Sequence, residues 1–473
     1  MQQSGCIGKI RDDLREDAGL FRYLVDDLAR RCGNVSYRQR QEVRSLIAVI
    51  ESLTKRVEAF RAKVDAPENS MQPPLLYKEK QLIISDIHAV SGIVGSVIVA
   101  SHWQSPAIDQ SVVDQAGSRK GKILAHFNDY TRDQHALGEL FEKQYRRAYV
   151  PLPLTIPVYT YATNSGMAAL TTAALMVLGE IPKDTAVLMG ESCYFETKQL
   201  LHSLFGTRIV SVDFSDMHST ADAVHKYKPA AIFADTIGNE PAMRIVDIPV
   251  LLSIMKRSGY SQTYVVADVS ASSFMRPLSG KWRVPSGVML IGVESQNKFL
   301  QFGCDRVTAG VVWGTGFAAM KLYDYRDHAG TICPDATIAS LPTPSRHIAT
   351  RYIIRLARNA ALMARLFFHN DKVKRLGVSV RYPESDGFNG AYFMLFWKEH
   401  PLRTFDGYIK KVMKIAKQRG IPLVHGTSFG FHTTRVYTVA MHTHYEKPFL
   451  RISPGTETEQ EIGDLARLLI DAL

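Results

Sequence analysis

The chain has 473 residues, 46% of them hydrophobic, which is enough to bury two or three globular cores. Its five cysteines lack CxxC or other metal-type spacing, so the sequence predicts a reducing compartment, no disulfide framework and no metal site. The formal net charge is +11, but the basic residues are spread along the chain without a nucleic-acid motif, so we expect no nucleic-acid partner.

The start of the chain lacks the apolar region of a secretory signal, since charged residues follow at once. The longest uncharged apolar run, residues 89–101, is too short to span a bilayer. We therefore expect a cytoplasmic protein that does not interact with a membrane.

Apolar residues recur at helical spacing over residues 8–66, on two faces separated by Gly33-Asn34. This pattern predicts a helical hairpin that serves packing or oligomerisation. The proline-containing segment 65–74 reads as a linker, so a first domain is expected over residues 1–74. The signal over residues 75–120 is too weak to assign elements.

A small polar turn, Ser165-Gly166-Met167, precedes a long Ala-rich helix. Free backbone N–H groups at a helix start attract anions, so this turn predicts a phosphate site. An ordinary Ser or Asn N-cap would give the same pattern. GxGxxG and Walker patterns are absent, which argues against a nucleotide phosphate.

Strands and helices then alternate along the chain. The predicted strands are 186–189, 208–212, 230–235 and 263–268, and the predicted helices are 194–204, 221–227 and 249–258. This alternation predicts a mostly parallel sheet covered by helices on both faces.

The pattern changes after about residue 330. Helices are predicted over 347–368, 404–419 and 458–473, and a strand over 391–397. We therefore expect a large α/β domain over residues 75–335, with an N-terminal arm over 75–150, and a smaller α+β domain over 336–473.

Two apolar strands end in residues suited to chemistry. One ends in Asp268, and the next runs into a polar turn that ends in Lys298. A desolvated lysine has a lowered pKa and offers the free amine that imine formation needs. A carboxylate at the same sheet edge can keep a pyridine nitrogen protonated, as pyridoxal 5′-phosphate (PLP) requires. Taken singly, Lys298 also fits a solvated surface lysine, and Asp268 fits a strand-end cap. Their occurrence together, at the ends of consecutive strands, is what indicates PLP.

In this order the motifs resemble the PLP enzymes of cysteine and methionine metabolism, the family of cystathionine γ-synthase, cystathionine lyases and methionine γ-lyase. The resemblance covers residues 120–470. It implies PLP fold type I, an α/β fold with a large, mostly parallel seven-stranded sheet and a smaller C-terminal α+β domain, extended here by N-terminal helices. Ser295-Gln296-Asn297-Lys298 resembles the family's Ser-x-Thr-Lys. The match implies that Lys298 carries the Schiff base with PLP, that Ser295 contacts the phosphate and that Asn297 lies at the cofactor.

Further matches imply the rest of the cofactor site. Asp268 corresponds to the aspartate that pairs with the pyridine nitrogen. Ser165, Gly166 and Met167 match a Ser-Gly-Met-Ala turn whose amides hold the phosphate. Tyr194 matches a Tyr-x-x-Thr tyrosine that stacks on the ring and is a candidate acid for the leaving group, so Lys298, Asp268 and Tyr194 are the expected catalytic residues.

The last matches imply the substrate site and the assembly. Asn239 resembles an Asn-Pro asparagine near the cofactor ring, and Arg451 resembles the arginine that binds the substrate α-carboxylate. Ser428 lies in a turn that loosely follows the family's Ser-Leu-Gly and is assigned to substrate binding. Tyr130 and Arg132 resemble a Tyr-x-Arg pair that reaches the phosphate of a neighbouring subunit, which implies a homodimer or homotetramer with shared active sites.

The chain departs from the family pattern at three points. Glu294 replaces a usual His, Asn297 replaces a Thr, and Glu240 stands between Asn239 and Pro241. These departures concern the substrate and the outcome of the reaction rather than cofactor binding.

Three functions follow from these patterns. The first is a lyase or transferase that catalyses β/γ-elimination or γ-replacement on a cysteine, homoserine or methionine derivative, including C–C or C–S bond-forming synthases of specialised metabolism. The second is another PLP reaction of the aminotransferase, decarboxylase or aldolase type, because one fold supports many chemistries. The third is a non-catalytic assembly protein that uses the N-terminal hairpin.

Overall fold

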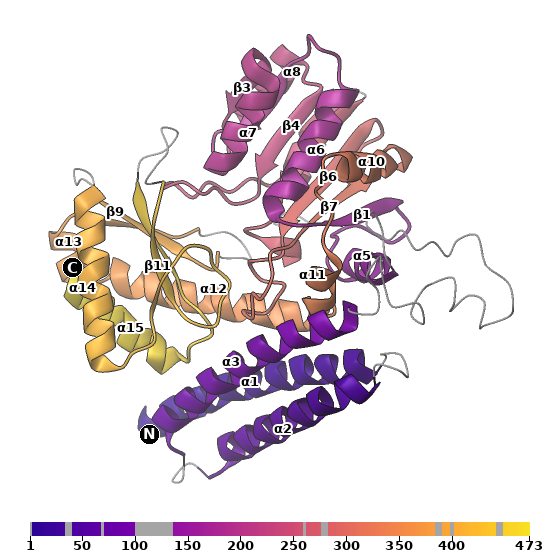
Figure 1. Cartoon of the computed structure of the whole chain (residues 1–473). Coiled ribbons are helices and arrows are strands. Elements are labelled where there is room, and N and C mark those ends of the chain that lie inside the picture. The colour runs from indigo at the N-terminus through magenta and orange to yellow at the C-terminus, as the bar shows by residue number, and fades with distance from the viewer. Residues whose placement is uncertain are drawn as a thin grey trace, which may run out of the picture. The chain divides into compact units, whose positions relative to one another are not determined.

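A computed structural model (Figure 1) describes residues 2–33, 40–67, 71–99, 136–258, 262–275, 282–383, 390–397, 402–440 and 448–473. The chain divides into two compact units. The first comprises residues 1–144, 304–309 and 332–344, and the second comprises the remainder.

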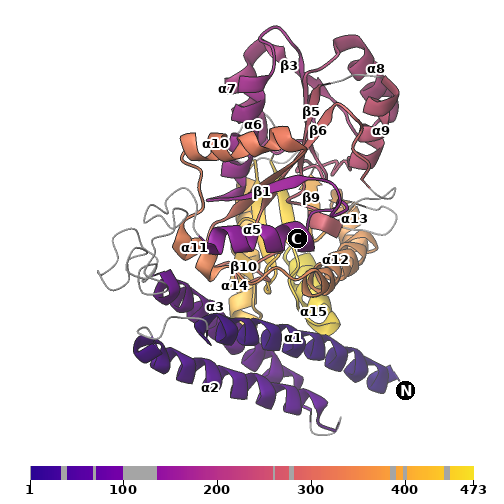
Figure 2. The same cartoon turned by 90° about the vertical axis from the view of Figure 1, so that its right-hand side faces the viewer.

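The first unit is helical. Its helices are α1 (Gln2–Gly33), α2 (Arg40–Asp65), α3 (Pro73–Val99) and the short α11 (Asp335–Ser340). Helices α1, α2 and α3 lie side by side (Figures 1 and 2). The apolar stripes of α1 and α2, which include Leu14, Phe21, Val57 and Phe60, are buried. The helical hairpin predicted over residues 8–66 is therefore present, and α3 packs against both of its helices.

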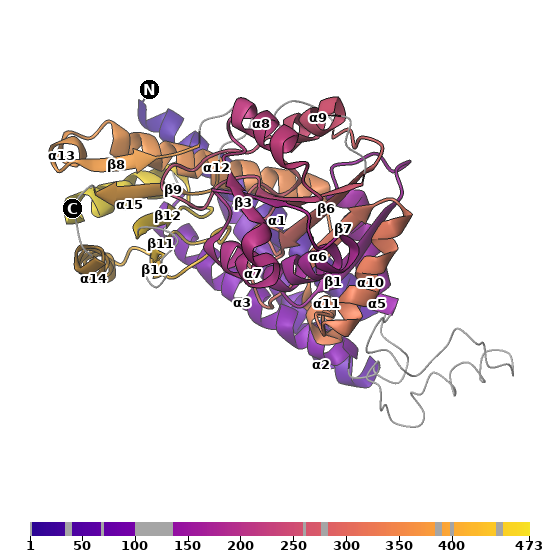
Figure 3. The same cartoon turned by 90° about the horizontal axis from the view of Figure 1, so that it is seen from above.

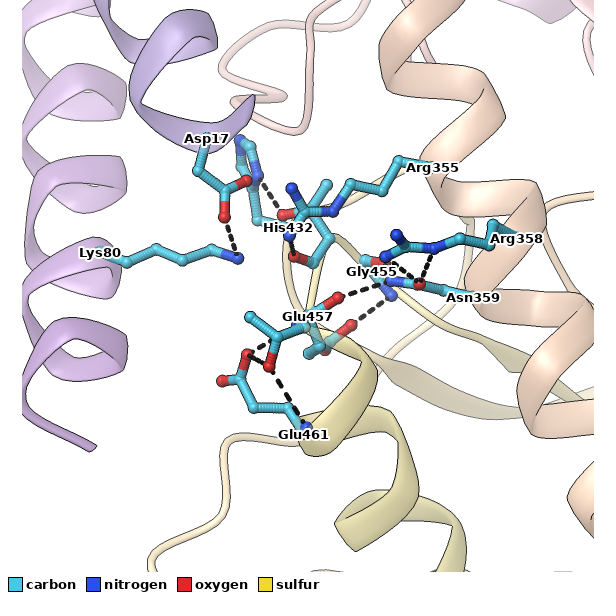
Figure 4. Close-up of polar contacts among 11 residues, drawn as sticks. Asp17, Lys80, Arg355, Arg358, Asn359, His432, Gly455, Glu457 and Glu461 are labelled. Atoms are coloured by element: carbon cyan, nitrogen blue, oxygen red, sulfur yellow. Dashed lines mark hydrogen bonds and ion pairs between the residues drawn. The ribbon is translucent and has the colours of Figure 1, made fainter. Parts of the chain in front are cut away.

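Helix α3 corrects the expectation drawn from the apolar run 89–101. Residues 89–99 of that run form the end of a helix that begins at Pro73 and is long and apolar enough to cross a membrane, by length and composition. Forty-four per cent of its most apolar window is buried within the structure. Lys80 of α3 is also buried, and its Nζ lies 2.8 Å from Oδ2 of the buried Asp17 in α1 (Figure 4). Packing within this unit thus accounts for much of the apolar sequence of α3.

The second unit contains a seven-stranded sheet. Its strands are β1 (Val158–Thr163), β2 (Val187–Gly190), β3 (Ile209–Val212), β4 (Ala231–Asp235), β5 (Thr263–Asp268), β6 (Val288–Ser295) and β7 (Gly310–Thr315). They follow the order β1-β7-β6-β5-β4-β2-β3. The five strands from β3 to β6 in this order are parallel, and β7 runs antiparallel to both β6 and β1. The predicted mostly parallel seven-stranded sheet is confirmed.

Helices cover both faces of this sheet. They are α6 (Gly166–Glu180), α7 (Phe195–Phe205), α8 (Met217–Tyr227), α9 (Ile248–Ser258) and α10 (Lys321–His328). Helices α6, α7 and α10 lie on one face, and α8 and α9 on the other (Figures 2 and 3). Strands buried on both faces need continuous apolar sequence, and every residue of β4 is buried. Short 3₁₀ turns cover Gly206–Arg208, Ser273–Met275 and Phe317–Met320. Helix α5 (Ala136–Ala148) precedes the sheet in the chain, and its residues up to 144 are assigned to the first unit.

The C-terminal part of the second unit is a smaller α+β layer. Its helices are α12 (Arg346–Phe368), α13 (Asp371–Arg375), α14 (Leu402–Arg419) and α15 (Glu459–Ala472). Its strands are β8 (Val378–Arg381), β9 (Phe393–Trp397), β10 (Val424–His425), β11 (Arg435–Val439) and β12 (Phe449–Ser453), in the order β10-β11-β12-β9-β8. This agrees with the α+β region predicted after residue 330.

The two units do not follow the three sequence ranges expected for the domains. Helix α3, expected in the arm of the large domain, groups with α1 and α2, and residues 332–344 join the same unit through α11. Contacts between segments that lie far apart in the chain leave no periodic pattern, so the sequence did not indicate this grouping.

Candidate functional site

Two carboxylates lie side by side at the C-terminal edge of the large sheet. Asp235 ends β4 and Asp268 ends β5, and the two residues are direct partners in the parallel register. Burial raises the pKa of both groups, and the negative charge of Asp268 raises the pKa of Asp235 further. The charge of Lys298 opposes the rise at Asp268. This edge therefore favours a cation as a partner.

Lys298 follows β6 at the same sheet edge and is half-buried. Its Nζ donates a hydrogen bond of 2.8 Å to Oγ of Ser428 and lies 5.2 Å from the centre of the Phe429 ring. Ser428 Oγ in turn donates to the carbonyl oxygen of Asn297 at 3.2 Å. The fold thus brings together Lys298, Asn297 and Ser428.

The turn that contains Ser428 packs closely against the backbone of Lys298. Gly430 has a φ of 87°, and a Cβ atom there would lie 1.3 Å from the carbonyl oxygen of Lys298. Only glycine combines this dihedral angle with such a close approach. Tyr352 Oη donates to the Gly430 carbonyl at 2.8 Å and holds the turn from α12.

The start of α6 faces the end of β6. Ser165 is the N-cap, and its Oγ accepts from the amide of Ala168 at 3.0 Å. The amides of Gly166 and Met167 have no acceptor within the helix, as expected for its first turn. A Cβ atom on Gly166 would lie 2.6 Å from Cβ of Ser295. The predicted phosphate turn and Ser295 are therefore in direct contact.

Polar backbone contacts hold the end of β6 next to β5. The amide of Ser295 donates to Oγ of Ser270 at 2.8 Å, and the amide of Ser270 donates to Oδ1 of Asp268 at the same distance. The amide of Asn297 makes a longer contact, 3.4 Å, with Oγ of Ser295. This chain of contacts fixes Asp268 relative to the turn that leads to Lys298.

Arg451 is a buried cation near these groups. It lies in β12, is 7% exposed, and its Nη1 donates to Oδ1 of Asn239 at 3.1 Å. Its guanidinium lies 5.7 Å from the Tyr392 ring and 5.6 Å from the Phe429 ring, and burial lowers its pKa. Within the described residues, Nε of Arg451 and Nδ2 of Asn239 are buried without a hydrogen-bond partner.

The turn after β12 is firmly anchored. Nδ2 of Asn359, in α12, donates to the carbonyl oxygens of Gly455 and Glu457, both at 2.8 Å (Figure 4). The buried Glu457 carboxylate accepts from the amides of Thr434 and Gly455. These bonds tie β11, β12 and α12 together and so fix the strand that carries Arg451.

Tyr194 lies at the start of α7, next to the sheet edge. Its amide donates to Oδ2 of Asp235 at 2.8 Å. Burial raises the pKa of its hydroxyl well above the usual value, and the charge of Arg451 lowers it in part. Tyr194 therefore keeps its proton over the physiological pH range.

Two of the predicted site residues lie outside the described residues, namely Tyr130 and Arg132. The other predicted residues converge on one region, formed by the edge of β4, β5 and β6, the start of α6 and the turns beside β11 and β12.

Sequence reasoning missed three residues of this region. Asp235 carried a usable signal, because β4, like β5, ends in a carboxylate and neighbouring parallel strands end together. Phe429 stands directly after Ser428, in the turn already assigned to substrate binding, whereas Tyr392 carried no signal and appears in the sequence as an ordinary core aromatic residue.

The sequence is similar to known proteins over much of its length. Residues 96–390 match the model of the family described as Cys/Met metabolism PLP-dependent enzyme. A curated relative, the bifunctional enzyme flvA of Aspergillus flavus, is 24% identical over 319 residues. The match includes 66% of this chain but only 38% of the relative's length.

Solved structures show the same fold. Cystathionine γ-synthase of Xanthomonas oryzae pv. oryzae, in complex with cystathionine, is 16% identical with a TM-score of 0.59 and covers 81% of this chain and 98% of its own. The metB protein of Corynebacterium glutamicum is 19% identical with a TM-score of 0.57, covering 75% and 89%. The methionine γ-lyase CalE6 of Micromonospora echinospora is 18% identical with a TM-score of 0.55, covering 77% and 98%.

Proposed function

We propose, since this chain belongs to the family of Cys/Met metabolism PLP-dependent enzymes, that it catalyses β/γ-elimination or γ-replacement on an amino-acid substrate. The substrate class we infer is a cysteine, homoserine or methionine derivative. The names of the related solved proteins, a cystathionine γ-synthase and a methionine γ-lyase, support this class. A C–C or C–S bond-forming synthase of specialised metabolism falls within the same proposal.

The residues of the site fit PLP. The free amides of Gly166 and Met167, with Ser165 and Ser295 beside them, would hold the phosphate. Asp268 would face the pyridine nitrogen, since this sheet edge favours a cation.

Four further residues would complete the cofactor site. Lys298 would bond to the aldehyde, and the Tyr194 ring would stack on the pyridine ring. The unpartnered Nδ2 of Asn239 would face the cofactor ring, and Asn297 would lie beside it. When bound, PLP supplies an electron sink for negative charge that develops beside the substrate amine.

The protein's own groups would then bind the substrate and move its protons. Lys298, oriented by Ser428, would accept a proton at Cα and return one at Cβ or Cγ of the substrate. Tyr194, which keeps its proton, would donate it to the leaving group. Asp268 would stay ionised while a cation faces it.

The observation that carries the proposal is the buried guanidinium of Arg451. In the described part of the chain it forms no ion pair with a carboxylate, and its Nε is left without an acceptor. A desolvated cation needs a charged partner, and a planar carboxylate fits two guanidinium nitrogens at once. Arg451 would therefore bind the α-carboxylate of the substrate within reach of Lys298.

The assembly and location are also part of the proposal. We infer a homodimer or homotetramer in which Tyr130 and Arg132 reach the phosphate site of a neighbouring subunit, and a cytoplasmic location.

The test combines a cofactor titration with a substrate screen. Purified protein is titrated with PLP and then given cysteine, homoserine and methionine derivatives. We expect visible absorbance from bound PLP and release of a 2-oxo acid with ammonia, or a replacement product when a thiol is added. Amine transfer that depends on an added keto acid would instead indicate an aminotransferase, and a chain that takes up no PLP would refute the proposal.

The first prediction concerns Lys298. Lys298→Ala removes the amine that would bond to the cofactor, so we expect loss of turnover by at least about three orders of magnitude and loss of the visible absorbance. Lys256→Ala, at an exposed position of α9, is the control and should change neither. Turnover retained in Lys298→Ala would contradict the assignment.

A further inference from the structure

Helix α7 is capped by a residue from outside the helix. Its N-cap residue is Tyr194, whose side chain makes no capping hydrogen bond. The first N–H groups of a helix need acceptors from elsewhere. Oδ2 of Asp235, at the end of β4, accepts from the amide of Tyr194 at 2.8 Å. The acceptor at the start of this helix is therefore supplied by the neighbouring strand.

The segment before α7 is attached to the β4 edge at two more points. Sγ of Cys193 donates to the carbonyl oxygen of Phe233, in β4, at 3.6 Å. The amide of Asn239, just beyond β4, contacts the carbonyl oxygen of Ser192 at 3.4 Å. The contact to Asp235 is the shortest of the three, so it contributes most to the position of Tyr194.

The surroundings of Asp235 argue against a purely structural cap. It is 8% exposed and lies in register with Asp268, so two buried carboxylates repel each other. Lys198, one turn into α7, partly offsets this repulsion. The oxygen acceptor at this position joins the start of α7 to the strand that lies in register with Asp268, so it fixes the position of Tyr194 relative to Asp268.

We propose that Asp235 is a positioning residue for Tyr194, fixing its backbone relative to β4 and, through the strand register, relative to Asp268 on β5. This inference rests on the proposed function, in which Tyr194 and Asp268 contact opposite parts of the same cofactor. Asp235 itself need not touch PLP.

The experiment is a double-mutant cycle on PLP affinity. The Kd for PLP is measured by titrating apoprotein of the wild type, Asp235→Ala, Tyr194→Ala and the double variant. Loss of the cap should weaken PLP binding about fivefold in Asp235→Ala, as expected for a helix-cap contact. In the Tyr194→Ala background the same change should have no further effect, because Asp235 acts through that ring. Equal weakening in both backgrounds would overturn the inference.

Two further variants separate positioning from general stability. Asp235→Asn keeps an oxygen acceptor for the Tyr194 amide, so its Kd should stay near that of the wild type. Asp216→Ala removes the N-cap of α8, whose carboxylate accepts from the amides of His218 and Ser219 away from the site. It should lower the thermal midpoint of the apoprotein and leave the Kd unchanged. If Asp216→Ala weakened PLP binding as much as Asp235→Ala, the inference would fail.

The outcomes also separate this inference from the proposed function. A wild type that takes up no PLP would refute the function itself. A wild type that binds PLP, with an unchanged Kd in Asp235→Ala, would overturn only the role of Asp235.

Discussion

Glu294 is a buried acid on β6, 2% exposed, one residue before Ser295. The hydroxyl of Tyr145 donates to its Oε2. Burial raises the pKa of Glu294 to about 7, and the charge of Asp268 adds to the rise, while the nearby hydroxyls of Ser273 and Tyr145 oppose it. In the sequence this residue stood out only as a departure from the usual His. The structure makes it a titratable group of the folded state near neutral pH.

Glu294 makes stability depend on pH. Its folded pKa lies above the unfolded value of 4.5, so its contribution is complete below pH 4.5 and is lost as the pH rises to about 7. Glu294→Gln removes this titration and keeps an acceptor for Tyr145. We expect the two proteins to be similar in stability near pH 4.5 and the variant to be more stable at pH 8, by up to on the order of 3 kcal/mol. Urea unfolding at both pH values measures this, and parallel stability curves would contradict it.

At the scale of residues, the sequence was informative where a side chain belongs to a short local pattern. Lys298, Ser165 and Asp268 could be predicted because each follows directly from a strand end or a helix start. Tyr392 and Phe429 could not, because their position around Arg451 depends on how β9 and the turn before β11 pack.

At the scale of elements, the start of α6 is the most constrained part of the site. Gly166 has no room for a side chain, because a Cβ atom would lie 2.6 Å from Cβ of Ser295. Gly166→Ala would push the first turn of α6 away from β6 and displace the two free amides. We expect the Kd for PLP to rise by about tenfold or more, because overpacking typically costs about 1–3 kcal/mol of free energy.

Gly463 provides the matched control for this prediction. It lies inside α15, and nothing stands within 4 Å of an added Cβ atom. Gly463→Ala should leave the Kd unchanged and raise stability by about 0.5–1 kcal/mol, since alanine favours the helix. Isothermal titration with PLP and thermal unfolding of both variants would check the pair. Normal PLP affinity in Gly166→Ala would show that this turn does not hold the phosphate.

Elements could be predicted from the sequence where their periodicity was strong. The strands β2 to β5 and the helices α12 and α15 agree with the predicted ranges to within a few residues. Helix α8 begins at Met217 rather than at residue 221, because the Asp216 carboxylate caps an additional first turn. That turn contains no buried apolar residue, so the apolar pattern of the sequence did not indicate it. Helix α3 was missed because apolar residues also lie on its exposed side, Leu82 and Ile93 among them, which obscures the helical period of its buried positions.

At the scale of the whole molecule, the helical unit contains a buried ion pair of its own. Nζ of Lys80 and Oδ2 of Asp17 lie 2.8 Å apart, and neither side chain reaches solvent. Lys80→Met would leave the Asp17 carboxylate buried without this ammonium. We expect a loss of about 3–5 kcal/mol in the free energy of unfolding, measured by urea titration with far-ultraviolet circular dichroism.

Two further variants serve as comparisons for Lys80→Met. Lys63→Met breaks an exposed pair with Glu79 in the same unit, at 2.9 Å, and should cost less than about 1 kcal/mol. Combining Lys80→Met with Asp17→Leu removes both charges and should restore much of the stability. Equal losses in Lys80→Met and Lys63→Met would contradict the buried pair's importance.

The division of the molecule into two units was the part least accessible from sequence. Residues 304–309 and 332–344 belong to the helical unit although they are flanked by segments of the other. Such grouping depends on contacts such as those of Tyr23 and Arg31 with the backbone of residues 339–343, between segments some 300 positions apart. Local patterns carry no information on contacts of this range.

The lone guanidinium in β12 has a practical consequence for work at the bench. Acetate, formate and citrate all present the planar anion that Arg451 lacks. If Arg451 binds the substrate carboxylate as proposed, a buffer made from such acids would compete with the substrate for this position. The buffer anion would then inhibit the enzyme, and a weak substrate would appear to be inactive.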